Sequence, residues 1–416
     1  MNHAANAVSR AQSDGVRAHP RSDVAAPPAV PRSRHGNLAE ARSWCANRLH
    51  RRFTVVPTSR LLCTPRLCEV VGVRRGRSLR RLARLIVCAV LVVPAACSVR
   101  VRTPEFGPAQ GPPRLIDHAW ITADGTRLPV TRWLPEGRPR GVVLALHGFG
   151  EHRNAFFTLG PALAAAGYAL YAYDQRGFGE TPHRGLWPGQ DVLIDDARAA
   201  WRLLRRHYPE TPVYLLGHSM GGAVAALAVT GPGAIHPAST VLVAPAVHGW
   251  GTLPWIQEAA LVAGAWIAPG ARPQQSSAHH FVDIRITDDR RILALQARDE
   301  QILRAVRLDM VYALVDMMSA AVERIDALPP ATLILYGEKD DLVPRSAACA
   351  MLARLADRAA PRPRLALYDD GYHYLLRDRQ RPRTIADLVA WLGTTGATLP
   401  SGAALPVAQG RERLCR

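Results

Sequence analysis

Lysine is nearly absent from this 416-residue chain: Lys339 is the only one, so almost all of the 52 basic residues are arginines. The formal net charge is +18 at pH 7, but residues 1–103 hold 19 arginines against only four acidic residues. The rest of the chain is close to neutral and offers no basic face. We therefore interpret the arginine excess largely as codon bias and do not expect nucleic acid as a partner.

Cysteine is scarce where the chain can fold. Five of the seven cysteines lie within the first 97 residues, and only Cys349 and the near-terminal Cys415 follow. A single core cysteine supports no disulfide framework. Cys63 and Cys68 lack the further Cys or His neighbours that would complete a zinc site.

The first quarter of the chain lacks an apolar run long enough to span a membrane. Residues 1–73 are rich in Arg, Ala, Pro and Ser and lack an apolar period, so we expect a disordered basic leader. Residues 74–97 then combine a basic stretch, the apolar run LIVCAVLVV and a small-residue ending. This combination is typical of a secretory signal, and the run is too short for a membrane-spanning helix.

The ending Ala95-Ala96-Cys97 resembles a bacterial lipobox, although Pro94 stands where that motif prefers Leu. The resemblance implies lipidation at Cys97 and a membrane-anchored protein of the cell envelope that faces the periplasm. Because such signals work at an N-terminus, we expect residues 1–73 to lie upstream of the true start. The alternative is a cytoplasmic protein with a merely apolar stretch. Residues 98–113 hold four prolines and predict a linker.

From residue 114 onward, short β-rich runs alternate with segments of helical period. This pattern predicts an α/β fold with a mostly parallel central sheet covered by helices. We expect the core at residues 114–245 and 326–394, a helical segment at 246–325 and a loose tail at 395–416. An amphipathic helix is expected at 191–207. The expected strands are 142–146, 169–173, 213–216, 240–243, 332–336 and 365–368.

The sequence Gly217-His218-Ser219-Met220-Gly221 fits the motif Gly-x-Ser-x-Gly. The bare motif arises by chance in about one of ten chains of this length. Here, however, it follows an expected strand and opens a helix of small residues, as a nucleophile elbow requires. Glycines are needed there because a Cβ atom would collide with backbone in so tight a turn. The alternative is a serine that only caps the helix.

A serine nucleophile needs a general base, and the base needs a carboxylate that fixes its tautomer. In α/β enzymes that carry a nucleophile elbow, the chain order of these three residues is serine, acid, histidine. The loop after the strand TLILY offers Asp340, with Asp341 as the second choice, although both could merely cap the next helix. The loop after the last strand offers one histidine, His373, which we expect to be the base rather than a surface residue on a turn.

The turn His147-Gly148-Phe149-Gly150 follows another expected strand. Two backbone N–H groups must stabilise the oxyanion of a tetrahedral intermediate, and we expect those of Phe149 and Met220. His147 and His152 lack a carboxylate at metal-site spacing, so we expect them to support the loop by hydrogen bonds. We expect neither a metal nor an organic cofactor.

Five sequence blocks together resemble the monoacylglycerol lipase and lysophospholipase-like branch of the α/β-hydrolases, which is grouped with the serine aminopeptidases. The resemblance covers residues 115–393 and implies an α/β-hydrolase fold with a helical cap inserted before the acid-bearing strand. It implies the same nucleophile, acid, base and oxyanion donors as above. The blocks are HGFGEH at 147–152, YDQRGFGETPHRG at 173–185, GHSMGG at 217–222, YGEKDDLVP at 336–344 and DDGYH at 369–373.

The resemblance implies hydrolysis of a single-acyl lipid ester, a monoacylglycerol or lysophospholipid, through an acyl-enzyme. A short-chain carboxylesterase, an aminopeptidase-like amidase and a catalytically silent binding protein are the alternatives. The expected cap is rich in apolar side chains, which can line an acyl tunnel, touch a membrane or simply pack the cap onto the sheet. These residues are Trp250, Leu253, Trp255, Ile256, Leu261, Val262, Trp266 and Ile267.

Overall fold

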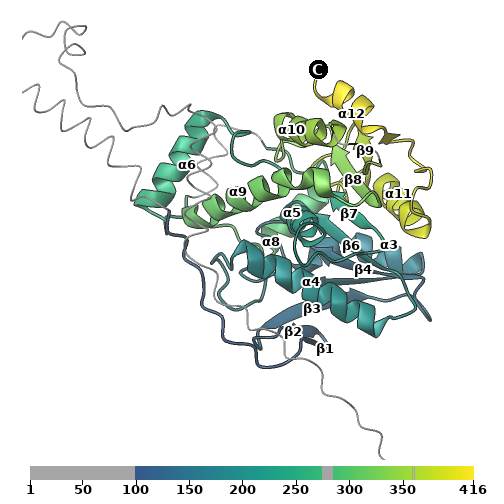
Figure 1. Ribbon diagram of the computed structural model, residues 1–416, viewed down its shortest axis with the longest axis horizontal. Coiled ribbons are helices and arrows are strands. Elements are labelled where there is room, and N and C mark those ends of the chain that lie inside the picture. Colours follow the sequence, from purple (N-terminus) through teal and green to yellow (C-terminus); the bar gives the residue numbers. More distant parts are fainter. Residues whose placement is uncertain (1–98, 274–283, 358, 360) are drawn as a thin grey trace, which may run out of the picture. The chain divides into compact units, whose positions relative to one another are not determined.

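The computed structural model describes residues 99–273 and 284–416, apart from positions 358 and 360 (Figure 1). The expected leader, the signal-like segment and Cys97 lie outside the described residues, so the predictions about them stay predictions. Within the described ranges, no helix combines the length and apolar content needed to cross a bilayer.

One mostly parallel sheet runs through the described part of the chain, in the strand order β1-β2-β3-β5-β4-β6-β7-β8-β9-β10. The strands from β4 to β9 are mutually parallel, whereas β1, β2, β3 and β10 pair antiparallel at the two ends. The expected α/β fold is confirmed, and the six expected strands are β4 to β9. The strands are β1 (Arg114–Ile116), β2 (Ala119–Ile121), β3 (Arg127–Trp133), β4 (Gly141–Leu146), β5 (Tyr168–Tyr173), β6 (Val213–His218), β7 (Thr240–Val243), β8 (Thr332–Gly337), β9 (Arg364–Tyr368) and β10 (Ala404–Leu405).

The central strands are apolar throughout because both faces of the sheet are covered. In β4, Val142 and Leu144 face one apolar core, while Val143 and Ala145 face the other. Every residue of β4, β5, β6, β7 and β8 is buried. Because these strands are buried on both faces, they appear in the sequence as continuous apolar runs and could be predicted from it.

Helices cover both faces of the sheet (Figure 1). Side chains of α4, α5, α10 and α12 belong to one apolar core, and those of α3 and α11 belong to the other. The expected helix at 191–207 is α4. The helices are η4 (Arg153–Phe156), α3 (Leu159–Ala165), α4 (Gln190–His207), α5 (Met220–Ala228), α6 (Trp255–Ile267), α8 (Arg290–Arg298), α9 (Leu308–Glu323), η5 (Ile325–Ala327), α10 (Arg345–Ala356), α11 (Arg381–Gly393) and α12 (Val407–Leu414).

Three of these helices, α6, α8 and α9, lie in the segment between β7 and β8 where we expected a cap. Helix α9 contacts both the core helix α5 and helix α6. Of the apolar residues singled out there, Trp250, Leu253 and Leu261 pack against the core. The other five remain exposed on α6: Trp255, Ile256, Val262, Trp266 and Ile267.

The end of the chain is not the loose tail that we expected at 395–416. Strand β10 pairs antiparallel with β9, and α12 contacts α10 and β9. A disulfide joins Cys349 of α10 to Cys415, although the sequence suggested no disulfide framework. The expectation failed because β10 has only two residues and α12 only eight, too few to show a hydrophobic period.

The segment expected as a linker also lies against the fold where it is described. Val101 packs on the apolar core, and the ring of Phe106 lies 4.4 Å from the Arg176 guanidinium carbon. The amide of Gln110 donates to the carbonyl of Ala123 at 2.6 Å. Residues 99–113 therefore run along the surface of the core and contact it, unlike a free linker.

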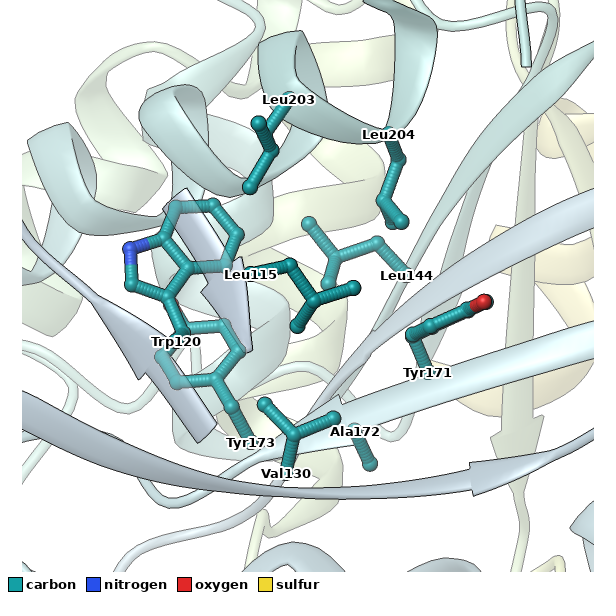
Figure 2. A pocket seen from close by; sticks show the side chains of 9 residues that line it. All are labelled: Leu115, Trp120, Val130, Leu144, Tyr171, Ala172, Tyr173, Leu203 and Leu204. Atoms are coloured by element: carbon teal, nitrogen blue, oxygen red, sulfur yellow. The ribbon is translucent and has the colours of Figure 1, made fainter. Parts of the chain in front are cut away.

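A small apolar pocket lies beside the antiparallel end of the sheet, where Leu203 and Leu204 of α4 point toward Leu115 (Figure 2). Its volume of about 10 Å³ suits at most one water-sized guest. The remaining lining residues, all aromatic or aliphatic, are Trp120, Val130, Leu144, Tyr171, Ala172 and Tyr173. We interpret it as a packing gap, too small for an acyl chain.

Candidate active site

Ser219 lies at the sharp turn between β6 and α5 and is only 6% exposed. Its φ of 53° and ψ of −118° are strained for a residue with a side chain. A Cβ atom on Gly217 would overlap the carbonyl of Gly221, and one on Gly221 would overlap that of Leu146. Both glycines of the motif are therefore required by close backbone approach, as predicted.

Asp340 and His373 come from the loops after β8 and β9 and meet in the buried interior. The His373 Nδ1 atom lies 2.8 Å from Asp340 Oδ2, and both side chains are almost fully buried. The other oxygen, Asp340 Oδ1, accepts the amides of Leu342 and Val343 at 2.9 and 2.8 Å. These bonds fix the carboxylate so that His373 Nδ1–H donates to it, which leaves Nε2 free to accept a proton.

Asp341, the second choice for the acid, points elsewhere. Its side chain is exposed, and Oδ2 accepts the amide of Arg285 at 3.2 Å. The geometry therefore favours Asp340 over Asp341, and favours a pairing role for Asp340 over simple helix capping.

The two expected oxyanion donors come from two different turns of the chain. Met220 is the first residue of α5, and Phe149 follows the carboxyl end of β4. The neighbouring amide of Gly221 donates to the His147 carbonyl at 3.1 Å, which ties the two turns together. Within the described residues, neither Phe149 nor Met220 donates its own amide to another group, so both remain available.

His147 and His152 are buried and support the loop, as expected. The neutral His147 ring donates from Nδ1 to the Gly148 carbonyl and accepts the Gln175 amide at Nε2. Burial lowers the pKa of His147 to about 4, so it stays neutral. His152 Nε2 lies 2.7 Å from Asp299 Oδ2, a contact that joins the loop to the cap.

A buried charged cluster beside the site was missed by the sequence reasoning. Glu151 Oε2 accepts the Gly148 amide and lies 3.2 Å from His218 Nδ1, while Arg377 lies 2.5 Å from Oε1. Burial alone would raise the pKa of Glu151, but Arg377 and His218 outweigh it and hold that pKa well below its usual value. His218 Nε2 in turn lies 3.1 Å from the carbonyl oxygen of His373.

This cluster connects the oxyanion loop, the nucleophile turn and the histidine loop. The signal for Glu151 was its place in HGFGEH, next to the oxyanion loop. Nothing in the sequence pointed to its pairing with Arg377, which lies more than two hundred residues away.

Ser219 and His373 open into a cavity of about 510 Å³ between the core and the cap. That volume falls in the range of small-molecule sites. Most of the lining is apolar and comes from both parts of the fold: Phe149, Met220, Ile284, Ile286, Leu293, Ile302, Leu303, Leu314, Met318, Leu342 and Val343. Among the described residues, no group of three or more His, Cys, Asp or Glu could hold a metal ion.

Sequence comparison finds the serine aminopeptidase (S33) family over residues 137–380, more than half of the chain. The monoacylglycerol lipase of Mycolicibacterium smegmatis is 26% identical over 282 residues, which cover 66% of this chain and 96% of that protein. The human monoglyceride lipase is 36% identical over 148 residues, which cover 35% of this chain and 46% of that protein.

Among solved structures, a soluble variant of the Saccharomyces cerevisiae monoglyceride lipase superposes with a TM-score of 0.54 at 19% identity. The alignment covers 71% of this chain and 97% of that one. This likeness confirms the α/β-hydrolase fold, and the family match confirms the resemblance seen in the five blocks. The chain belongs to the serine aminopeptidase (S33) family of α/β-hydrolases and is a serine hydrolase of the lipase and esterase type.

Proposed function

We propose that this protein hydrolyses carboxylic esters of single-acyl lipids, such as monoacylglycerols or lysophospholipids. The observation that carries the proposal is the apolar cavity of about 510 Å³ into which Ser219 and His373 open. A cavity lined by aliphatic side chains from core and cap suits one hydrocarbon chain. The relatives named monoacylglycerol lipase or monoglyceride lipase support the same substrate class.

In the proposed mechanism, Ser219 Oγ attacks the ester carbonyl while His373 Nε2 takes its proton. Asp340 stabilises the resulting imidazolium, and the amides of Phe149 and Met220 donate to the oxyanion. The imidazolium then protonates the leaving alcohol, which leaves an acyl group on Ser219. Water, deprotonated by His373, releases the fatty acid and restores the serine.

The cavity favours a lipid ester over the substrate of an aminopeptidase. A free α-ammonium group, once desolvated, needs an anionic partner. Among the described residues that line the cavity, Glu151 is the only acidic one, and its carboxylate already pairs with Arg377 and His218. An incoming ammonium would therefore have to compete with a buried ion pair.

Hydrolysis of glycerol monoesters of increasing acyl length tests the proposal. We expect kcat/KM to rise from acetate to medium and long chains, because each buried methylene adds transition-state binding. Leu314→Trp, which fills the cavity from α9, should lower kcat/KM for long chains by about tenfold and barely affect acetate. Glu323→Trp, at the exposed end of α9, controls for the added bulk. A kcat/KM that falls steadily with length would favour the short-chain esterase instead.

We also propose that helix α6 docks the enzyme on a lipid surface. Trp255, Trp266 and Ile267 are 75%, 52% and 72% exposed, and α6 buries only Ala265. Tryptophan and aliphatic residues on one exposed helix suit the boundary between headgroups and acyl chains. Together with Trp250, residues of α6 line a further hollow of about 560 Å³.

The hydrogen bonds near the first described residues also support docking through α6. The Arg102 amide donates to Asp309 Oδ2, and the Asp309 amide donates to the carbonyl of Pro269, just beyond α6. Cys97 precedes Arg102 by five residues, a reach of at most roughly 18 Å. A lipid on Cys97 would therefore enter the bilayer near α6.

The Cys349–Cys415 disulfide supports a location in an oxidising compartment, consistent with the proposed export to the periplasm.

Vesicle sedimentation and cell fractionation test the docking proposal. We expect Trp255→Gln combined with Trp266→Gln to weaken partition of the purified full chain into phospholipid vesicles by at least about tenfold. Leu134→Gln changes a residue 47% exposed on the core and serves as the control. In cells, Cys97→Ser should release the protein from the membrane fraction. Unchanged partition of the double tryptophan variant would contradict docking through α6.

A further inference from the structure

The C-terminal helix α12 is fastened to the core at both ends. At its start, β10 pairs with β9 and Val407 is buried. Near its end, Leu414 is buried and Cys415 forms the disulfide with Cys349 of α10. Midway, Gly410 approaches Leu365 so closely that a Cβ atom would overlap that side chain. The family match ends at residue 380, so this helix lies outside the matched region.

One side chain of α12, Arg413, reaches the two loops that carry the expected acid and base. Its Nε atom lies 2.6 Å from Glu338 Oε1, and its terminal nitrogen pairs with Asp369. Glu338 is two residues before Asp340, and Asp369 is four residues before His373. Arg413 therefore bridges the loop that carries Asp340 and the loop that carries His373. The Asp340–His373 hydrogen bond joins the same two loops.

These two loops already run side by side. The Glu338 amide donates to the Tyr368 carbonyl at 3.0 Å, and the Lys339 amide donates to the Gly371 carbonyl at 2.9 Å. Lys339 also pairs with Asp370. Without Arg413, no arginine would lie between the carboxylates of Glu338 and Asp369, and their repulsion, which solvent partly screens, would shift the two loops slightly.

From this geometry we infer that Arg413 is a positioning residue for the Asp340–His373 pair, held in place by the Cys349–Cys415 disulfide. The inference rests on the proposed function of that pair. Helix α12 has only eight residues, and helices this short are marginal by themselves. The disulfide therefore adds to the packing of Val407 and Leu414 in holding Arg413 in place.

The same arrangement makes turnover sensitive to reduction. Cys415 is exposed and Cys349 is partly exposed, so a dithiol reductant can reach the bond. The disulfide then takes up two electrons and two protons to become two thiols, while the dithiol is oxidised to its own disulfide. Release of α12 loosens the bridge between the loops and misplaces His373 relative to Ser219, which slows the reaction.

Kinetics of the full chain, with and without a dithiol, test the inference. A fluorophosphonate that labels Ser219 counts competent sites, and kcat and KM for a soluble ester are measured per labelled site. We expect Arg413→Gln to lower kcat about five- to tenfold with KM unchanged, because the bridge is partly exposed and its loss shifts the pair only slightly. Arg413→Lys should recover part of the loss. Arg411→Gln, on the exposed side of the same helix, should keep the parent values.

Reduction of the parent should produce the same fall in kcat, and Cys349→Ser should show it without reductant. Circular dichroism verifies that each protein is folded at the assay temperature. Arg413→Gln keeps the disulfide, so it remains informative if Cys349→Ser does not fold. A parent that labels but retains its kcat after reduction, or a folded Arg413→Gln with parent kinetics, would overturn the inference alone. A parent that fails to label would overturn the proposed hydrolysis and this inference together.

Discussion

Ser219→Ala is expected to lower ester hydrolysis by on the order of 10⁴-fold or more while the protein stays folded. The hydroxyl at this position is the proposed attacking atom, and binding plus the oxyanion donors would preserve only residual catalysis. Alanine retains the Cβ atom, so the strained turn with φ of 53° is not altered by the substitution. The measurement is kcat/KM on a glycerol monoester together with fluorophosphonate labelling.

The matched control for this experiment is Ser346→Ala, an exposed serine on α10. It should leave both activity and labelling at the parent level. Activity of Ser219→Ala within tenfold of the parent would remove Ser219 from the mechanism, and so would undiminished labelling of that variant.

The parts of the fold that could be predicted from sequence are those with strong local signals. Strands β4 to β9 are continuous apolar runs because helices cover both faces of the sheet. Strands β1 and β2 have only three residues each, and β1 is largely exposed, so neither carries a readable pattern. Helix α12 was missed for a similar reason, since only Val407, Gly410 and Leu414 of its eight residues are buried.

The residues of the site also divide into those that local sequence signals predicted and those that such signals could not predict. Ser219, Asp340 and His373 each follow a predicted strand, and open α/β sheets collect their functional groups at the strands' carboxyl ends. That rule predicted which loops would meet, and the structure brings Asp340 and His373 together. It could not predict side-chain partners from distant segments. The pairs Glu151–Arg377 and Cys349–Cys415 depend on tertiary packing that no local pattern encodes.

The choice between Asp340 and Asp341 was the point that sequence left open, and it leads to the second large effect. Asp340→Asn is expected to lower kcat by about 10⁴-fold, whereas Asp341→Asn should stay within about twofold of the parent. Asp340 is buried against His373, and Asp341 is exposed and accepts only a backbone amide from Arg285 among its described hydrogen bonds.

The size of the Asp340→Asn effect follows from the hydrogen bonds of that carboxylate. Its Oδ1 accepts two amides, from Leu342 and Val343, and an asparagine carbonyl would take over that role. The amide nitrogen would then face His373 Nδ1 at the former Oδ2 position. Because an amide N–H donates, Nδ1 must accept, and the histidine proton moves to Nε2. In that tautomer Nε2 cannot take the proton of Ser219. Thermal unfolding of both variants checks that the fold persists, and a larger loss for Asp341→Asn would transfer the role of acid to Asp341.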